Sequence, residues 1–412
     1  YISVTGVQTC ALPIWKSING GSSWSPLADE LASIGCSDLV IDPSNTNVLY
    51  LATGDTDGKD TYSIGVLKST DGGLTWSATG LMFAVNQSYT IAKMLVDPLN
   101  PQIIYAATST GLMKTVDGGV NWVMIKNTGF RDIEFKPFNS NTIYGTNNSS
   151  FWFSKDGGAT WGATPTNFAG SVGRSSLAVT PADSNYIYIL GAKGASGSAA
   201  DYGFEGIVRS TDGGQSFSLM SSSPNILGWN TNGNDQGGQG WYDLALACSP
   251  VNKNLIFTGG VNLWKSTNGC ATLSNCSNWF GSGNSYAHAD QHAIEFLPGS
   301  GTTVFVANDG GVFKTTNTGT SWSDFSTGLC IAQQYNLGVS QTTPGITLTG
   351  WQDNGTNLHN TTTCGEVLGG DGFECIVSWS GSNTMYGELY YGDISKSTNG
   401  GGSWSNIVSS GG

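Results

Sequence analysis

Residues 69–76, STDGGLTW, decide the fold of this chain because related stretches return along nearly the whole sequence. Each copy begins with Ser or Thr, has Asp or Asn at its third position, and all but one end in Trp or Phe. The other copies, one of them the degraded STNGCATL, cover residues 17–24, 115–122, 154–161, 210–217, 266–273, 315–322 and 397–404. Most intervals are about 40 to 55 residues, the period of one four-stranded β-propeller blade.

The segments around each copy predict four short strands. An apolar segment comes first, as in residues 37–43 (SDLVIDP), and a second follows a polar turn, as in residues 48–53 (VLYLAT). A third segment leads into the repeated turn, and a fourth begins at its aromatic residue. Alternating apolar residues between turn formers indicate strands. We therefore expect an all-β fold, with a half unit at residues 15–30 and eight units from about residue 37 to 408.

The repeated turn has a structural explanation. Its carboxylate can accept hydrogen bonds from backbone N–H groups of the same turn, and Gly-Gly supplies the positive φ that a reversal needs. The aromatic residue is expected to pack in the core between sheets. The residues assigned this structural role are Asp71, Asp117, Asp156, Asp212, Trp24, Trp76, Trp122, Trp161, Trp322 and Trp404.

Composition excludes two classes of function. The net charge is −13 and no basic stripe is present, which argues against a nucleic-acid partner. No apolar stretch of 18 residues occurs, so no membrane span is expected. An acidic surface poor in lysine is compatible with an extracellular protein.

The two ends call for separate treatment. Residues 4–14, VTGVQTCALPI, look like a translated sequencing adapter, so we set residues 1–14 aside as an artefact. We expect the natural sequence to resume inside a repeat, which leaves the question of a signal peptide open.

The cysteines leave two interpretations open. Cys270 and Cys276 are six positions apart, and Cys364 and Cys375 are eleven apart, so two local disulfides would suit an oxidising compartment. Buried free thiols are the alternative. No CxxC occurs, so no structural zinc site is expected.

The repeated turns at this spacing resemble those of the Asp-box (BNR) propeller superfamily, which includes sialidases, sortilin-type receptors and tandem-propeller xyloglucanases. Longer stretches, such as residues 54–73 and HADQHA at 288–293, look like a group of secreted bacterial repeat proteins. The xyloglucanase resemblance implies a seven-bladed ring plus part of a second ring. A single ring of eight to ten blades is the alternative.

The resemblance does not fix an activity. Sialidases clamp a carboxylate with three arginines, whereas this chain has only Arg131, Arg174 and Arg209, and Arg209 stands just before a repeated turn, where Lys68 stands in another unit. A sialidase is therefore not expected. The two catalytic carboxylates of xyloglucanases come from a first blade and a second propeller, and no residue of this chain can be matched to them.

The candidate site lies on the face opposite the repeated turns, where the loops between strands two and three and between blades lie. His288, Asp290 and His292 start a first strand and, at a period of two, point the same way. They could form a metal site or an acid–base pair, or a hydrogen-bonded structural cluster. Carboxylates expected to converge with them, as acid and base on a glycosidic bond, are Asp309, Asp353, Asp371 and Glu374.

Two further loops are candidates for binding. Residues 225–242 carry Trp229, Trp241 and Asp235 among Gly, Asn and Gln, so the loop could stack on sugars, or its tryptophans could fill gaps between blades. Asp55, Asp57 and Asp60 could bind calcium or form a solvated acidic loop.

The sequence therefore predicts a secreted or cell-surface propeller that recognises polysaccharide, with glycoside hydrolase activity of the xyloglucanase type as an extension. The alternatives are a sortilin-like module that binds extracellular protein and a purely structural repeat.

Overall fold

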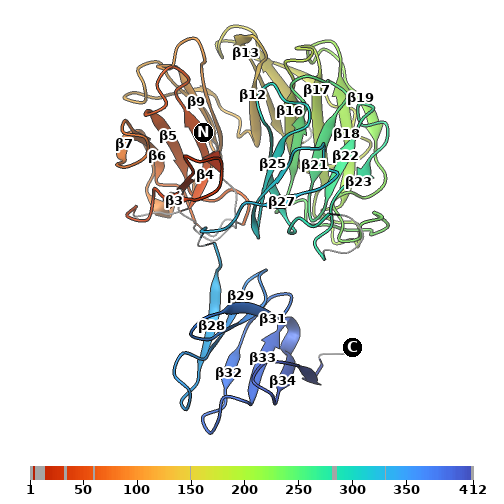
Figure 1. Cartoon of the computed structure of the whole chain (residues 1–412). Coiled ribbons are helices and arrows are strands. Elements are labelled where there is room, and N and C mark those ends of the chain that lie inside the picture. Colours follow the sequence, from red (N-terminus) through yellow and green to blue (C-terminus); the bar gives the residue numbers. More distant parts are fainter. Residues whose placement is uncertain are drawn as a thin grey trace. The chain divides into compact units, whose positions relative to one another are not determined.

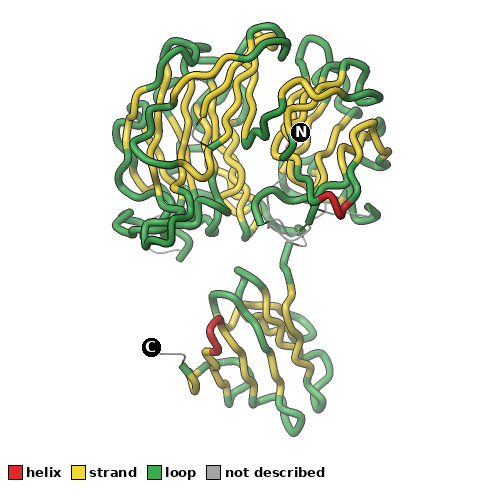
Figure 2. The backbone as a smooth tube through the Cα atoms, turned by 180° about the vertical axis from the view of Figure 1, so that it is seen from behind, coloured by secondary structure: helices red, strands yellow, loops and turns green. Residues whose placement is uncertain are grey.

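The computed structural model describes residues 3–4, 14–31, 35–58, 61–148, 150–280, 285–329 and 331–409. These residues form strands and loops, with two short 3-10 turns, η1 (Val85–Gln87) and η2 (Tyr390–Gly392) (Figure 2). Among them are nine antiparallel sheets of consecutive strands, one with three strands and eight with four. The predicted all-β fold of four-stranded blades is confirmed. No helix in the described part of the chain is long and apolar enough to cross a membrane.

The chain divides into unit 1, residues 1–329, and unit 2, residues 330–412. Seven of the described sheets belong to unit 1 and two to unit 2 (Figure 1). The sheets of unit 1 are β1 (Ser3–Val4), β2 (Trp15–Lys16), β3 (Ser25–Pro26); β4 (Cys36–Ile41), β5 (Leu49–Thr53), β6 (Gly65–Ser69), β7 (Ser77–Met82); β8 (Ile91–Val96), β9 (Ile104–Thr108), β10 (Gly111–Thr115), β11 (Val123–Lys126); β12 (Asp132–Lys136), β13 (Asn139–Asn147), β14 (Ser150–Ser154), β15 (Gly162–Pro165); β16 (Val172–Val179), β17 (Ile187–Lys193), β18 (Phe204–Ser210), β19 (Ser218–Ser221); β20 (Ala245–Cys248), β21 (Ile256–Gly259), β22 (Leu263–Ser266), β23 (Ser274–Asn275); and β24 (Gln291–Phe296), β25 (Val304–Asn308), β26 (Gly311–Thr315), β27 (Ser323–Asp324). Those of unit 2 are β28 (Gln334–Val339), β29 (Thr347–Trp351), β30 (Thr356–His359), β31 (Cys364–Leu368); and β32 (Cys375–Val377), β33 (Met385–Leu389), β34 (Asp393–Ser397), β35 (Ser405–Val408).

In the four-stranded sheets of unit 1, the second strand lies deep in the core. β5, β9 and β25 are buried along their whole length, and their sequences are nearly continuous runs of apolar and small residues. Such a run is typical of a strand that packs on both faces, because each blade lies between two others. The first strands of consecutive blades also pack against each other, from β4 through to β24.

Neighbouring blades are joined at the repeated turns. The buried hydroxyl of Tyr50 and the ammonium of Lys68 both donate to the carbonyl of Gly118 in the next turn, at 3.1 and 3.0 Å. A cationic residue directly before a repeated turn therefore ties one blade to the next in several places. The same cation-to-carbonyl bond recurs in the pairs Lys16–Gly72, Lys114–Gly157, Arg209–Gly269 and Lys265–Thr318.

The first and last sheets of unit 1 are also joined. Trp24 Nε1 donates to the carbonyl of Phe325 at 2.8 Å, although the two residues are 301 positions apart. Unit 1 is thus closed on itself, and the three-stranded sheet completes it.

The repeated turns satisfy their own polar groups. Asp71 accepts bonds from the Thr75 hydroxyl (2.6 Å), the Thr75 backbone N–H (2.9 Å) and the Ser69 hydroxyl (2.8 Å). These bonds lower the pKa of Asp71 to about 2. The aromatic residues of the turns lie at different depths: Trp24, Phe217 and Trp322 are buried, whereas Trp76, Trp122, Trp161 and Trp404 are half-buried and pack against the hydrophobic clusters.

The described cysteines are all free thiols, so neither Cys270–Cys276 nor Cys364–Cys375 is a disulfide. Cys270 and Cys276 are buried in different hydrophobic clusters, which explains why their proximity in sequence does not join them. Burial raises the pKa of Cys276 to about 12. The sequence left local disulfides and free thiols open, and the structure has free thiols.

Candidate functional site

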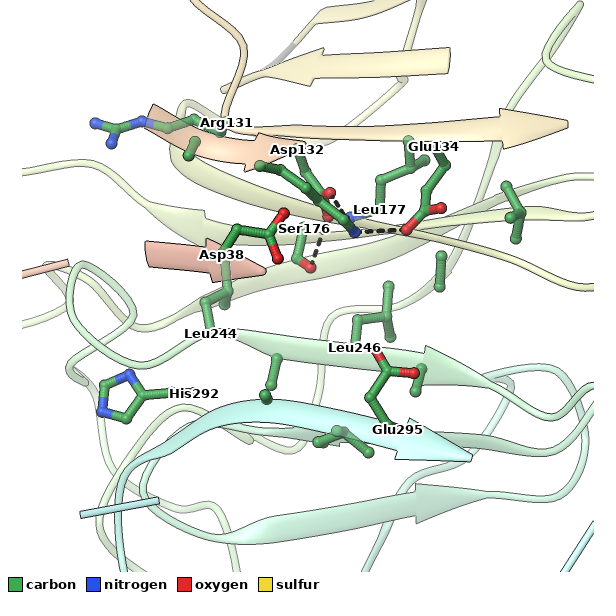
Figure 3. A pocket seen from close by; sticks show the side chains of 18 of the residues that line it. Asp38, Arg131, Asp132, Glu134, Ser176, Leu177, Leu244, Leu246, His292 and Glu295 are labelled. Atoms are coloured by element: carbon green, nitrogen blue, oxygen red, sulfur yellow. Dashed lines mark hydrogen bonds and ion pairs between the residues drawn. The ribbon is translucent and has the colours of Figure 1, made fainter. Parts of the chain in front are cut away.

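Unit 1 encloses a cavity of about 640 Å³ that is lined by the first strands of six blades (Figure 3). At its middle, Lys93 pairs with Asp132 at 2.9 Å and Glu134 at 2.5 Å. Asp132 also accepts a bond from the Leu177 backbone N–H at 2.7 Å, which links β12 to β16. Burial, opposed by the charge of Lys93, raises the pKa of Glu134 to about 7. This ion cluster holds the first strands together.

A β-bulge aims His292 toward one end of this cavity. The pairing of β24 with β25 shifts between Gln291 and Ala293, so His292 is the unpaired residue. The first strands β4, β8 and β16 shift at the matching place, near their beginnings. A bulge bends a strand and redirects a side chain. His292 thereby lies where the first strands begin, on the loop face.

His292 joins two carboxylates there. Its Nδ1 lies 3.2 Å from Asp57 Oδ2, and its Nε2 lies 2.9 Å from Asp309 Oδ1. The Tyr242 hydroxyl donates to the other oxygen of Asp309 at 2.7 Å, and its ring meets the imidazole edge-to-face at 4.9 Å. Arg174 completes this set, which we call the mouth network: Asp57, Arg174, Tyr242, His292 and Asp309.

Arg174 is held by three acceptors. Its Nη2 lies 2.7 Å from Asp57 Oδ1, and its Nη1 donates to the carbonyls of Trp241 (2.8 Å) and Tyr242 (2.7 Å). The mouth network therefore draws on the β5–β6 loop, β16, the segment before β20, β24 and the β25–β26 turn, which belong to four different blades.

The charges of the mouth network stabilise one another. Burial alone would lower the pKa of His292, but Asp309 and Asp57 outweigh it and hold that pKa well above its usual value. Burial alone would raise the pKa of Asp57, but Arg174 and His292 outweigh it and lower that pKa. At neutral pH an imidazolium and a guanidinium thus share the Asp57 carboxylate.

A buried pair of acids lies beside the network. Burial, and then the charge of Asp309, raise the pKa of Asp290 to about 6, while burial and Asp290 raise the pKa of Asp243 well above its usual value. Asp290 accepts a bond from Gln239 Nε2 at 2.7 Å and has a left-handed backbone, with φ of 64°. Burial thus favours the neutral form of Asp243, whereas Asp290 is half-ionised near pH 6 and mostly ionised at pH 7.

The structure brings together some of the residues proposed from the sequence. Asp57, Asp290, His292 and Asp309 share one site, and the ring of His288 packs against the adjacent Gly310. Asp353, Asp371 and Glu374 lie in unit 2, where Asp371 accepts from the Asp353 backbone N–H at 2.7 Å and Glu374 accepts from Asn336. The convergence of these three with the histidines stays a prediction.

The loop between β19 and β20 carries the two proposed sugar-stacking residues. Trp229 and Trp241 are 47% and 48% exposed. Trp241 is flanked by the rings of Tyr202 and Tyr242, at 6.3 and 5.4 Å between centroids. Asp235 accepts a hydrogen bond from the Asn230 backbone N–H at 2.5 Å, so its carboxylate orders its own loop.

The proposed calcium ligands Asp55 and Asp57 have different hydrogen-bond partners. Asp55 accepts from the Asp57 backbone N–H at 2.8 Å, which is a local turn bond. Both oxygens of Asp57 face the cationic groups of Arg174 and His292, which compete with any metal ion for them. Asp60 lies outside the described residues.

Sequence reasoning missed Tyr242, Asp243 and the role of Arg174. The sequence did contain a signal for Asp243. An aspartate stands at or just before the first strand in several units, as at Asp38, Asp132 and Asp243. Nothing comparable marked Arg174, whose partners are distant in sequence.

Four-stranded blades joined by self-satisfied Asp-box turns, around a cavity with a charged network at its loop end, define an Asp-box β-propeller. The model of the sortilin/Vps10 family ("Sortilin, neurotensin receptor 3") matches residues 110–243. Xyloglucanases of Hypocrea jecorina and a Paenibacillus species are each 29% identical over 37% of this chain, covering 20% and 18% of their own lengths. The chain thus spans about a fifth of these curated relatives.

Solved structures share the fold. A GH74 enzyme of Niastella koreensis matches all of this chain and 66% of its own, with a TM-score of 0.68 and 19% identity. The GH74 xyloglucanase of Xanthomonas campestris matches 97% of this chain and 64% of its own, with a TM-score of 0.69 and 14% identity.

Proposed function

We propose that the loop face of unit 1 binds an extracellular polysaccharide of the β-glucan type. The observation that carries this proposal is the pair of half-exposed indole rings, Trp229 and Trp241, on one loop beside the mouth network. An indole presents a large apolar face on which a sugar ring can stack, while its edge can still hydrogen-bond. The xyloglucanases among the relatives support this choice of ligand.

The position of Trp241 favours a preorganised platform. Its backbone carbonyl is bonded to Arg174, and its ring packs beside Tyr202 and Tyr242. The Trp229 carbonyl accepts from Asn262 Nδ2 at 3.0 Å, which ties this part of the loop to the β21–β22 turn. Because the backbone is held at both places, little ordering is required when a ligand binds, and this lowers the entropic cost of binding.

Hydrolysis of the same polysaccharide is the finer proposal. A glycosidase needs one protonated and one ionised carboxyl group at the scissile bond. Among the described groups of this face, Asp290 has the raised pKa that suits an acid, whereas Asp57 and Asp309 are each held by two partners of the mouth network.

Binding to xyloglucan, followed by affinity electrophoresis and calorimetry, tests the proposal. We expect Trp241→Ala and Trp229→Ala each to weaken binding about tenfold, since a lost aromatic contact costs about 1 kcal/mol or more. The matched control is Phe138→Ala, which removes an 87% exposed ring from the β12–β13 turn on the opposite face. No retention of the unaltered chain, or equal weakening by the control, would overturn it. Release of reducing ends, lost in Asp290→Asn, tests hydrolysis separately.

A further inference from the structure

Two of the three arginines of the chain, Arg131 and Arg174, line the same cavity of unit 1. Arg131 directly precedes β12 and Arg174 belongs to β16, and these two first strands pack against each other. In Figure 3 the guanidinium of Arg131 points away from Asp132 and Glu134, at the end of the view where His292 lies. Both arginines therefore belong to the loop end of the cavity.

The two guanidinium groups differ in their partners. Arg174 is held by Asp57 and by the carbonyls of Trp241 and Tyr242. Arg131 is exposed, and within the described ranges no hydrogen bond or ion pair reaches its guanidinium. The neighbouring Asp132 is turned to Lys93 and Leu177 instead.

Two positive charges share one nearby carboxylate at this end of the cavity. Partial desolvation, and then repulsion by the positive charge of Arg174, lower the pKa of Arg131 and outweigh Asp57, while the Arg131 side chain stays open to solvent. The nearby carboxylate, Asp57, already forms ion pairs with Arg174 and His292. An added carboxylate would pair with Arg131 and relieve this repulsion.

We infer that Arg131 is a binding site for a sugar carboxylate, and that the polysaccharide recognised by unit 1 carries isolated uronic acid residues. This inference rests on the proposed function, because it places the carboxylate on a polymer stacked at Trp241. A planar guanidinium binds a carboxylate through two parallel hydrogen bonds, which makes the contact strong and directional. The backbone carbonyl of Trp241 accepts a bond from Arg174, which lines the same cavity as Arg131, so the stacking residue is tied to one member of the arginine pair.

The overall charge decides between sparse and dense acidic polymers. The chain carries a net charge of −13, so a polymer with a carboxylate on every sugar would be repelled along most of its length. A largely neutral polymer with occasional uronic acids gains the single contact at Arg131 without that repulsion.

The test compares one polysaccharide in two forms, untreated xyloglucan and the same sample lightly oxidised at its primary hydroxyls to uronic acids. We expect the full chain to bind the oxidised form about tenfold more tightly in low salt, the effect of one charge-assisted contact of about 1.4 kcal/mol. In Arg131→Gln the preference should fall to about one. The control Lys155→Gln removes one positive charge from an exposed residue at a repeated turn and should keep the preference.

Equal binding of both forms by the unaltered chain, or an undiminished preference in Arg131→Gln, would overturn the inference while leaving the proposed function intact. Failure to bind either form would overturn both. Because the exposed Arg131 has no hydrogen bond or ion pair to lose within the described ranges and is repelled by Arg174, its variant should not lower the thermal midpoint, and this is checked before the binding measurements.

Discussion

Arg174 and Asp57 are 117 positions apart in the sequence, yet their side chains form an ion pair of 2.7 Å at the loop end of the cavity in unit 1. The pair joins β16 to the loop between β5 and β6, two blades that are not consecutive in the chain. Because Asp57 also contacts His292 of β24, one carboxylate connects three blades.

Replacing Arg174 should destabilise unit 1. In Arg174→Gln, Asp57 loses its strongest partner while its side chain remains only 20% exposed, so we expect a loss of about 2 kcal/mol in the free energy of unfolding. Urea denaturation measures this loss. The control is Lys253→Gln, which breaks a more exposed pair with Asp183, whose side chains are 37% and 30% exposed, and should cost far less than the Arg174 substitution. Equal effects of the two substitutions would contradict the assigned role.

Asp290 should make the protein less stable as the pH rises. Its pKa is raised from 3.8 to about 6, so its neutral form is favoured in the folded state, and its contribution is lost between about pH 4 and pH 6. Asp290→Asn keeps the group neutral and tolerates the left-handed backbone. We expect the variant to be about 2 kcal/mol more stable at pH 7 and to match the unaltered chain near pH 4.

Thermal and urea unfolding between pH 4 and pH 8 check this expectation. The control Asp29→Asn alters an exposed aspartate and should leave the pH profile of stability unchanged. A stability difference for Asp290→Asn that does not vary with pH would show that the carboxyl group does not titrate as described.

Two glycines with similar φ angles allow the cost of backbone strain to be measured apart from the cost of steric crowding. Gly214, in a repeated turn, has φ of 85°, and a Cβ there would lie 2.4 Å from Phe151 Cε1. Gly197 has φ of 80°, with nothing within 4 Å of such a Cβ. We expect Gly197→Ala to cost about 1 kcal/mol for backbone strain alone, and Gly214→Ala to cost about 3 kcal/mol because a buried ring must also move. Similar costs in denaturant titrations would show that crowding is unimportant at the repeated turn.

The fold could be predicted because its signals are local. The carboxylate, the glycines and the flanking Ser or Thr of residues 69–76 bond within their own turn, so the turn is specified wherever that sequence returns. The aromatic residue of the turn also follows a local pattern. Trp122 bonds to the carbonyl of Gly119 in its own turn and packs, half-buried, against a hydrophobic cluster of unit 1.

The sequence by itself determined the blades, their order and the face that carries the variable loops, because strands, turns and meander connections depend on residues within about 40 positions of one another. Only the tertiary structure decided the site. Asp57, Arg174 and His292 meet because blades from distant parts of unit 1 surround one cavity, and the charge states of Asp243 and Asp290 follow from burial created by that packing. Electrostatic partners and burial are properties of the assembled unit, and no spacing within a single repeat encodes them.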